Sequence, residues 1–329
     1  MTTTTGHPSP TVLISENLLE RMPTLGERFP DVTFVELPLE GGELRPEYCG
    51  AHAMFRSAMS EDLFDDILRN APDLAWVQIA AAGFDWMGGD VLAERVAGGM
   101  VTTRSESSLN VTIAEYCIGA MLSAARRLPD YFEAQQRSEW ARYMGRDFIG
   151  STVAIFGTGA IGREVAWRVA ALGATPIGVS RSGAPAGQFE RVITSDQFHT
   201  VLPEADYVVL AMPLTPETEN MFGSTEFELM PEHAVLVNIG RGALTDEAAL
   251  VEALESGQIA SAFVDVFVEE PLPTDNPMWT TKNLVVTPHT SFRSDGNGAR
   301  LERDFVGNLE RFIAGDPLAG TMSHPELGY

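Results

Sequence analysis

The chain is 329 residues long, is 44% hydrophobic and 21% charged, and carries a formal net charge of −24 at pH 7. This length exceeds that of a usual single core, so we expect two domains. The excess of acidic residues excludes a basic phosphate-binding footprint, and we expect no nucleic-acid partner. No apolar run reaches 18 residues, so we expect no membrane span. The two cysteines lack metal-type spacing, so we expect neither a disulfide framework nor a metal site. Because the N-terminal residues show no leader pattern, we expect a cytoplasmic protein.

The first hundred residues have the pattern of a small α/β unit. Three short apolar runs predict strands there, at 11–15, 33–37 and 74–80. Ser60 is a suitable N-cap for an acidic amphipathic helix that runs to Arg69. A longer helix is expected over 112–127, ended by Pro129. Its apolar character exceeds what one buried face needs, which predicts either a core helix or a helix in a subunit interface.

From Thr152 onward, apolar strands and helices alternate strictly. The expected strands lie at 152–156, 175–179, 207–212, 234–239, 260–266 and 283–287. Continuous apolar strands separated by helices imply a parallel sheet that is covered on both faces. A last helix, at 298–314, follows the completed sheet, and we expect it to pack back onto the first domain. The predicted division is therefore a discontinuous domain of residues 1–103 and 293–329, and a second domain of residues 104–292.

A glycine-rich turn, Gly157-Thr158-Gly159-Ala160-Ile161-Gly162, lies between the expected strand at 152–156 and a helix at 161–172. The first glycine permits a tight turn, the second lets a pyrophosphate approach the backbone, and the third lets helix and strand pack closely. The helix N-terminus offers N–H groups and a positive dipole end to phosphates. In this context the turn favours a dinucleotide site on a Rossmann-type, doubly wound sheet over a glycine turn that binds nothing.

Three polar residues, Arg241, Glu270 and His289, each follow a predicted strand. Taken singly, each has a structural explanation: Arg241 could be an exposed arginine in a turn, Glu270 an acidic residue in a loop, and His289 a packing or capping residue. In an open parallel sheet, however, ligands bind outside the carboxyl ends of the strands, where these side chains can converge. Together they supply a guanidinium that binds carboxylates, a carboxylate that stabilises a protonated histidine, and a histidine that exchanges protons near neutral pH. The set suits proton transfer coupled to hydride transfer on a 2-keto acid.

With these residues the chain resembles the D-isomer-specific 2-hydroxyacid dehydrogenase family, in particular its glyoxylate/hydroxypyruvate reductases. The resemblance runs from about Leu74 to His289 and keeps the motifs in order. Besides the glycine turn, its segments are Ala211-Met212-Pro213-Leu214-Thr215-Pro216-Glu217-Thr218, Asn238-Ile239-Gly240-Arg241-Gly242-Ala243-Leu244, Asp265-Val266-Phe267-Val268-Glu269-Glu270-Pro271-Leu272-Pro273 and Thr287-Pro288-His289-Thr290. It implies a Rossmann-type cofactor domain and a smaller, flavodoxin-like α/β substrate domain made of the two chain ends.

The resemblance also implies roles for individual residues. Arg241 would hold the carboxylate and carbonyl oxygen of the substrate. His289 would be the acid/base that gives a proton to the carbonyl oxygen, and Glu270 would pair with it and keep it protonated. The family's small-residue loop matches Ala81-Ala82-Gly83, whose N–H groups would receive the substrate carboxylate.

For the cofactor, the resemblance implies contacts beyond the glycine turn. Asp265 would hydrogen-bond the nicotinamide carboxamide, Met212 and Pro213 would lie beside the adenosine half, and Ile239 would belong to the same site. The resemblance further implies a homodimer that uses the helix at 112–127, which fits the excess apolar character of that helix.

The end of the second strand of the expected dinucleotide domain departs from NAD-using relatives. Those relatives place an acidic residue there for the ribose hydroxyls, whereas this chain has Ser180-Arg181-Ser182. A hydroxyl followed by an arginine removes the anionic repulsion and supplies a partner for a 2′-phosphate. We therefore predict a preference for NADPH over NADH; the alternative is a surface arginine without a ligand.

The favoured interpretation is a reductase of a small 2-keto acid, such as glyoxylate, hydroxypyruvate or a longer analogue. Phe292 and Arg293 stand where relatives usually have small residues, and we expect them to border the cleft. One alternative is a nucleotide-sensing binding protein on the same fold, like the corepressor relatives, without significant turnover. Another is a formate or phosphite dehydrogenase relative, which is disfavoured because formate enzymes place glutamine where Glu270 stands.

Overall fold

The computed structural model describes residues 6–15, 18–19, 22, 24–38, 41–56, 59–80 and 89–322, with Glu106 and Ser107 described by their backbone alone. Contacts between residues divide the chain into two compact units. Unit 1 comprises Met1–Leu109 and Ser294–Tyr329, and unit 2 comprises Asn110–Arg293. The loop Ala81-Ala82-Gly83, predicted to bind substrate, lies outside the described residues.

Unit 1 is built on a five-stranded parallel sheet in the order β2-β1-β3-β4-β5. This order is that of flavodoxin-like doubly wound sheets. The strands are β1 (Thr11–Ser15), β2 (Thr33–Leu37), β3 (Ala53–Arg56), β4 (Trp76–Ile79) and β5 (Val101–Arg104). The helices are α2 (Leu25–Arg28), η1 (Pro46–Gly50, a 3₁₀ helix), α3 (Glu61–Asn70), α4 (Asp90–Ala97) and α10 (Asn297–Ala314).

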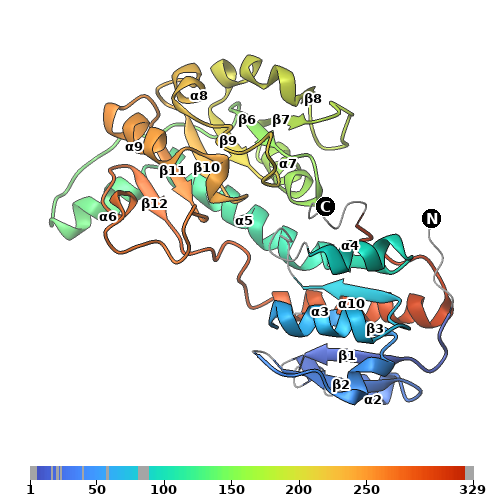
Figure 1. Ribbon diagram of the computed structural model, residues 1–329. Coiled ribbons are helices and arrows are strands. Elements are labelled where there is room, and N and C mark those ends of the chain that lie inside the picture. The colour runs from blue at the N-terminus through green and yellow to red at the C-terminus, as the bar shows by residue number, and fades with distance from the viewer. Residues whose placement is uncertain are drawn as a thin grey trace. The chain divides into compact units, whose positions relative to one another are not determined.

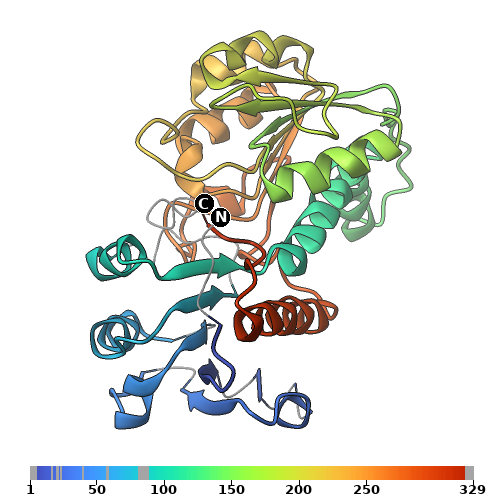
Figure 2. The same ribbon diagram turned by 90° about the vertical axis from the view of Figure 1, so that its right-hand side faces the viewer.

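Helices cover both faces of this sheet (Figures 1 and 2). Successive strand residues point to opposite faces, so Met54 packs in one cluster with α3, while Phe55 packs in another with α10. The rings of Phe55 and Phe305 of α10 lie 4.7 Å apart. The last helix thus completes the core of the first unit. As predicted, Ser60 caps α3, where its side chain accepts a hydrogen bond from the Leu63 N–H.

Unit 2 is built on a seven-stranded parallel sheet in the order β12-β11-β10-β9-β6-β7-β8. Counted from β6, this is the Rossmann order, with one strand added beyond it and the switch point between β6 and β9. The strands are β6 (Thr152–Phe156), β7 (Thr175–Ser180), β8 (Arg191–Thr194), β9 (Tyr207–Leu210), β10 (Val235–Asn238), β11 (Ser261–Val264) and β12 (Leu284–Val286).

The helices of unit 2 connect these strands and cover the sheet (Figure 1). The α-helices are α5 (Glu106–Ala125), which begins in unit 1, α6 (Leu128–Gln136), α7 (Ala160–Ala171), α8 (Ser224–Leu229) and α9 (Glu247–Ser256). The 3₁₀ helices are η3 (Ser195–Thr200), η4 (Leu202–Glu204), η5 (Gly242–Leu244) and η6 (Pro277–Trp279). The predicted class, two parallel α/β sheets of which one is Rossmann-type, is confirmed.

The structure differs from the sequence-based expectation at several elements. It contains three short strands that were not predicted, β3, β5 and β8. The helix expected from 112 begins at Glu106 and ends at Ala125. Pro129 lies in the first turn of α6, where a proline is tolerated because the first N–H groups of a helix lack acceptors. Arg127, with a φ of 57°, makes the break between the two helices.

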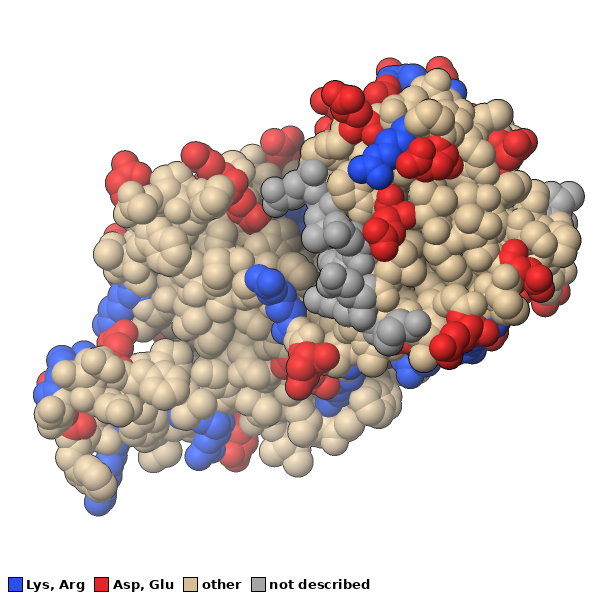
Figure 3. All heavy atoms as spheres, turned by 90° about the horizontal axis from the view of Figure 1, so that it is seen from below, with Lys and Arg blue, Asp and Glu red and all other residues tan. Residues whose placement is uncertain are grey.

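The charged surface agrees with the composition. Asp and Glu side chains are spread over the face seen in Figure 3, with fewer Lys and Arg side chains among them. Within the described residues, no helix is long and apolar enough to cross a membrane. In the same part of the chain, no group of three or more His, Cys, Asp or Glu side chains is placed to hold a metal ion.

Candidate active site

The glycine turn joins β6 to α7 and leaves room where a ligand would need it. A Cβ on Gly157, whose φ is +108°, would lie 2.5 Å from the Ala211 carbonyl oxygen. A Cβ on Gly162 would lie 1.9 Å from the Gly157 carbonyl oxygen, so only glycine lets α7 pack against the turn. At Gly159, the N-cap of α7, a Cβ would have no atom within 4 Å. Two glycines are thus required by packing, and the middle one borders open space.

The N-terminus of α7 can receive an anion. The first N–H groups of an α-helix have no acceptor within the helix, and here the Arg163 N–H is the one that bonds back to the Gly159 carbonyl. The first turn of this 12-residue helix contains no acidic residue. Dipole and free N–H groups therefore favour a phosphate at this end. The residues present fit the pyrophosphate of a dinucleotide.

Ser180, Arg181 and Ser182 lie at the carboxyl end of β7, the strand next to β6. The Ser180 hydroxyl accepts a hydrogen bond from the Gly183 N–H at 3.2 Å and keeps its own proton available for donation. The Arg181 side chain is exposed. The pKa of the nearby Glu217 carboxyl is lowered, mainly by a hydrogen bond from Thr215 and to a smaller extent by the Arg181 charge. Arg181 therefore places a positive charge at the end of β7, close enough to act on the Glu217 carboxylate.

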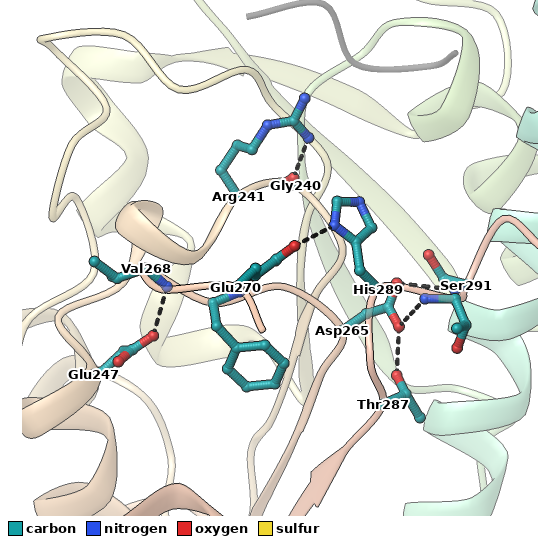
Figure 4. Close-up of polar contacts among 11 residues, drawn as sticks. Gly240, Arg241, Glu247, Asp265, Val268, Glu270, Thr287, His289 and Ser291 are labelled. Atoms are coloured by element: carbon teal, nitrogen blue, oxygen red, sulfur yellow. Dashed lines mark hydrogen bonds and ion pairs between the residues drawn. The ribbon is translucent and has the colours of Figure 1, made fainter. Parts of the chain in front are cut away.

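Glu270 and His289 make a side-chain hydrogen bond at the carboxyl edge of the same sheet (Figure 4). His289 Nδ1 lies 2.7 Å from Glu270 Oε2, and the two side chains are 43% and 35% exposed. Glu270 Oε1 accepts a hydrogen bond from the Phe267 N–H at 2.9 Å, which orients the carboxylate. Because Nδ1 is committed to Glu270, Nε2 is the nitrogen left to exchange a proton with a ligand.

Glu247, which was not predicted as a site residue, is hydrogen-bonded to the loop that carries Glu270. Its Oε1 accepts a hydrogen bond from the Val268 N–H at 2.8 Å (Figure 4). Glu247 is the first residue of α9, and Asp246 caps that helix. In the sequence it has the pattern of any acidic residue in a first helical turn, so no sequence signal distinguishes it.

Arg241 follows β10 and lies beside the Glu270 loop. Its side chain is half-buried, and one guanidinium nitrogen donates to the Gly240 carbonyl at 2.7 Å. Asn238 holds the backbone of this turn, donating to the Arg241 carbonyl and accepting from the Gly240 N–H. A Cβ on Gly242 would lie 2.0 Å from the Phe267 carbonyl carbon, so glycine is what allows the two loops to touch.

Asp265 follows β11 and is fully buried. Oδ1 accepts hydrogen bonds from the Thr287 hydroxyl and the Thr290 N–H, and Oδ2 accepts one from the Ser291 N–H (Figure 4). A carboxylate offers about four acceptor positions, so these three bonds leave one on Oδ2. Asp265 thus anchors the His289 loop.

The remaining predicted cofactor residues also lie at this edge of unit 2. A Cβ on Gly157 would come within 3.1 Å of the Met212 N, so the segment after β9 lies against the glycine turn. Met212 is partly buried, Pro213 is exposed, and Ile239 is buried at the end of β10. The described residues of unit 2 therefore hold the predicted catalytic residues and the predicted cofactor residues on one sheet.

Residues 118–291 match the family model described as D-isomer specific 2-hydroxyacid dehydrogenase, NAD binding domain, and this stretch is more than half of the chain. The chain belongs to the D-isomer specific 2-hydroxyacid dehydrogenase family. The resemblance predicted from the sequence is confirmed, and so is the enzyme class, since this is a family of NAD(P)-dependent oxidoreductases.

Individual family members show the extent of the similarity. The chain is 35% identical over 268 residues to D-3-phosphoglycerate dehydrogenase of Methanocaldococcus jannaschii, covering 80% of this chain but only 50% of that protein. It is 33% identical over 285 residues to glyoxylate/hydroxypyruvate reductase B of Enterobacter sp., covering 83% of this chain and 87% of that protein. The crystal structure of the D-isomer specific 2-hydroxyacid dehydrogenase of Xanthobacter autotrophicus Py2, in complex with NADPH and MES, matches with a TM-score of 0.83 at 26% identity and covers 98% and 100% of the two chains.

Proposed function

We propose that this protein reduces a small 2-keto acid, of the glyoxylate or hydroxypyruvate type, to the D-2-hydroxy acid and prefers NADPH. The observation that carries the proposal is the His289–Glu270 pair, with a 2.7 Å contact, on the same sheet edge as Arg241 and the glycine turn. A proton donor, a cation and a dinucleotide-type turn are the parts that such a reduction needs. The name of the Enterobacter relative, glyoxylate/hydroxypyruvate reductase B, supports the substrate class.

The proposed mechanism assigns one task to each side chain. Arg241 binds the substrate carboxylate and orients the carbonyl group, for which its planar guanidinium is suited. When bound, the nicotinamide cofactor supplies a hydride to the carbonyl carbon. His289 Nε2 donates the proton that the carbonyl oxygen needs, so that one hydride and one proton convert the ketone to an alcohol. Glu270 stabilises the protonated imidazole and fixes its ring through Nδ1.

We assign the cofactor to the glycine turn and the strand ends around it. Gly159 and the first N–H groups of α7 would face the pyrophosphate, and the free acceptor position of Asp265 would take the carboxamide. The other residues assigned to the cofactor are Gly157, Thr158, Ala160, Ile161, Gly162, Ser180, Arg181, Ser182, Met212, Pro213 and Ile239. In this proposal unit 2 binds the cofactor.

The preference for NADPH rests on the end of β7. Ser180 can donate a hydrogen bond, and the exposed Arg181 supplies a positive charge, whereas a carboxylate there would repel a 2′-phosphate. The related X. autotrophicus structure contains NADPH, which supports the assignment. The two cysteines, Cys49 and Cys117, are both free, which fits a reducing compartment such as the cytoplasm.

We further propose a homodimer, but with its contact beyond the helix that was expected to form it. The described side chains of α5 are mostly buried or half-buried. The exposed apolar side chains instead follow it: Phe132 of α6 is 61% exposed, and Trp140 and Met144 are 92% and 90% exposed. An exposed apolar group of this kind marks an association surface. Trp140→Ala with Met144→Ala should yield monomers by sedimentation, whereas Trp279→Ala, at a 49% exposed tryptophan elsewhere, should not.

The function is tested by steady-state assay of the purified protein on a panel of 2-keto acids with NADPH and with NADH. The proposal expects turnover of glyoxylate or hydroxypyruvate and a higher kcat/KM with NADPH. The stereochemistry is tested on hydroxypyruvate, whose product should be D-glycerate on a chiral column, because the product of glyoxylate reduction is achiral. Tight NADPH binding without turnover of any 2-keto acid would instead indicate the nucleotide-sensing binding protein. A kcat/KM that is equal for both cofactors, or favours NADH, would refute the cofactor assignment alone.

A further inference from the structure

We infer that Tyr116 is a positioning residue for His289, acting through a buried hydrogen-bond chain that runs from Tyr116 to Thr287 to Asp265. The chain joins α5, the end of β12 and the end of β11. Tyr116 makes its hydrogen bond to Thr287, not to His289 or Glu270. The inference rests on the proposed function, because it concerns the residue assigned as the proton donor.

The backbone at His289 needs support from its surroundings. Its φ is +50°, in the left-handed region that non-glycine residues rarely adopt. Its N–H donates to the Asp265 carbonyl at 2.8 Å and to the Thr287 carbonyl at 3.0 Å. These contacts fix the start of the turn, but the next two N–H groups must also be held if the imidazole is to meet Glu270.

The Asp265 carboxylate accepts hydrogen bonds from these two N–H groups. Its two carboxylate oxygens accept the N–H groups of Thr290 and Ser291, each at 2.9 Å, directly after His289. A buried carboxylate is tolerated only when donors satisfy it. The third donor is the Thr287 hydroxyl, at 2.5 Å from Oδ1. The Thr287 hydroxyl therefore helps to hold the Asp265 carboxylate in place.

The direction of the chain follows from the single hydroxyl proton of Thr287. That proton is committed to Asp265, since an ionised carboxylate only accepts. The 2.9 Å contact between Tyr116 Oη and Thr287 Oγ1 must then be donated by Tyr116. Burial raises the pKa of the Tyr116 hydroxyl, which keeps it a donor at all working pH values. Each bond polarises the next, so loss of the first weakens the last.

The chain predicts a graded series of variants. Tyr116→Phe removes only the first bond and should lower kcat by about fivefold, the size expected for one hydrogen bond, while KM for the cofactor stays unchanged. Thr287→Val removes two bonds and should cost more, and Thr287→Ser should restore most of the rate. The double variant should be no worse than Thr287→Val alone, because the chain is linear and the first bond has no other route to His289.

A purely structural role of Tyr116 would not alter the pH dependence of the reduction rate. That dependence therefore distinguishes a positioning role from a structural one. If the turn loosens, His289 loses part of its contact with Glu270, its protonated form is less favoured, and the rate of keto-acid reduction should fall at a lower pH than in the wild type. The matched control is Tyr207→Phe, at a buried tyrosine at the start of β9 in the same unit, whose ring packs on Phe148. It removes a buried hydroxyl, keeps the ring contact, and should leave the profile unchanged.

A second readout separates this inference from the proposed function. NMR titration of 15N-labelled histidines, with His289→Gln to assign the signal, follows the His289 ring without turnover. A midpoint displaced to lower pH in Tyr116→Phe and Thr287→Val, but not in Tyr207→Phe, supports the inference even if no keto acid is reduced. Unchanged NMR midpoints in the Tyr116 and Thr287 variants would overturn it, whatever the wild-type enzyme catalyses.

Discussion

The two units bury polar groups in different ways. In unit 1 the buried polar side chains on and next to β4, β5 and α10 are neutral, whereas β3 ends in a buried charge, Arg56. Gln78 donates to Ser105 at 3.0 Å and accepts from Asn308 at 3.0 Å. Asn308 also donates to the Ala319 carbonyl and accepts from the Ala319 N–H. In unit 2 the corresponding strand ends carry charges, with Asp265 fully buried and Glu270 and His289 partly exposed.

This difference corresponds to two roles: the buried polar groups of unit 1 stabilise the fold, and those of unit 2 position the groups proposed to react. Neutral amides and hydroxyls that satisfy one another can be buried completely at little cost, and in unit 1 they attach the C-terminal helix to the N-terminal sheet. A proton donor must stay accessible, so in unit 2 the reactive pair is partly exposed and its rigidity comes from buried groups behind it. Changes in unit 1 should therefore affect stability, and changes at the unit 2 edge should affect rate.

The largest expected effect is that of His289→Ala. Removing the proton donor should lower kcat by about 10²–10⁴-fold, the usual contribution of general acid–base catalysis, while the melting temperature stays within a few degrees. His199→Ala is the control, since His199 also pairs with a glutamate, Glu226, at 2.8 Å but on a remote surface. Steady-state kinetics and thermal melts check both. Retained activity in His289→Ala would exclude His289 as the acid.

Asn308→Ala should show the opposite pattern. It removes three hydrogen bonds and leaves buried partners on Gln78 and Ala319 unsatisfied, at a cost of about 2–4 kcal/mol in the free energy of unfolding. The kcat of the folded fraction should not change. Asn70→Ala, which removes one exposed hydrogen bond to Asp66, is the matched control and should cost well below 1 kcal/mol. Urea unfolding gives the values; a loss of kcat without loss of stability would contradict the comparison.

Arg181→Ala tests the cofactor end of unit 2. Without the guanidinium, kcat/KM for NADPH should fall by about 10-fold, as expected for a lost charge-assisted hydrogen bond, while that for NADH stays within about twofold. Ser180→Asp should go further and favour NADH. Arg191→Ala, which removes an exposed arginine paired with Glu204, is the control. If the ratio of the two kcat/KM values does not move in either variant, the assignment of the 2′-phosphate site is wrong.

Glu270→Gln should give the smallest change at the optimum pH and a clear change in the profile. The amide can still contact His289 but no longer stabilises its positive charge. A group that is stabilised in its protonated form keeps its proton to higher pH, so removing the carboxylate should move the fall in reduction rate to lower pH. The rate at pH 8 should then be about tenfold lower, which corresponds to moving the profile by about one pH unit. A pH–rate profile identical to that of the wild type would show that Glu270 does not act on His289.

Much of the fold could be predicted because its strong patterns are local. The strands at 11–15, 33–37 and 152–156 agree with β1, β2 and β6 residue for residue, since continuous apolar runs between turn residues are typical of buried parallel strands. β3, with the sequence AMFR, was missed because it lacks β-branched residues, and it is a strand because β1 and β4 pair with it on both sides. The first turn of α5 has poor helix formers, and tertiary packing overrides them.

Most of the strands and helices, the glycine turn, and the three side chains at the strand ends could be predicted from sequence alone, because each depends on neighbouring residues or on a motif. Three contacts became visible only in the folded chain: Asp265 lies buried under the His289 turn, Glu247 accepts a hydrogen bond from the Glu270 loop, and Tyr116 contacts Thr287, 171 positions away in sequence. These contacts join residues far apart in the chain, and no local pattern records them. The physical reason is that a charge can be buried only where donors from several elements meet, and the fold alone brings those elements together.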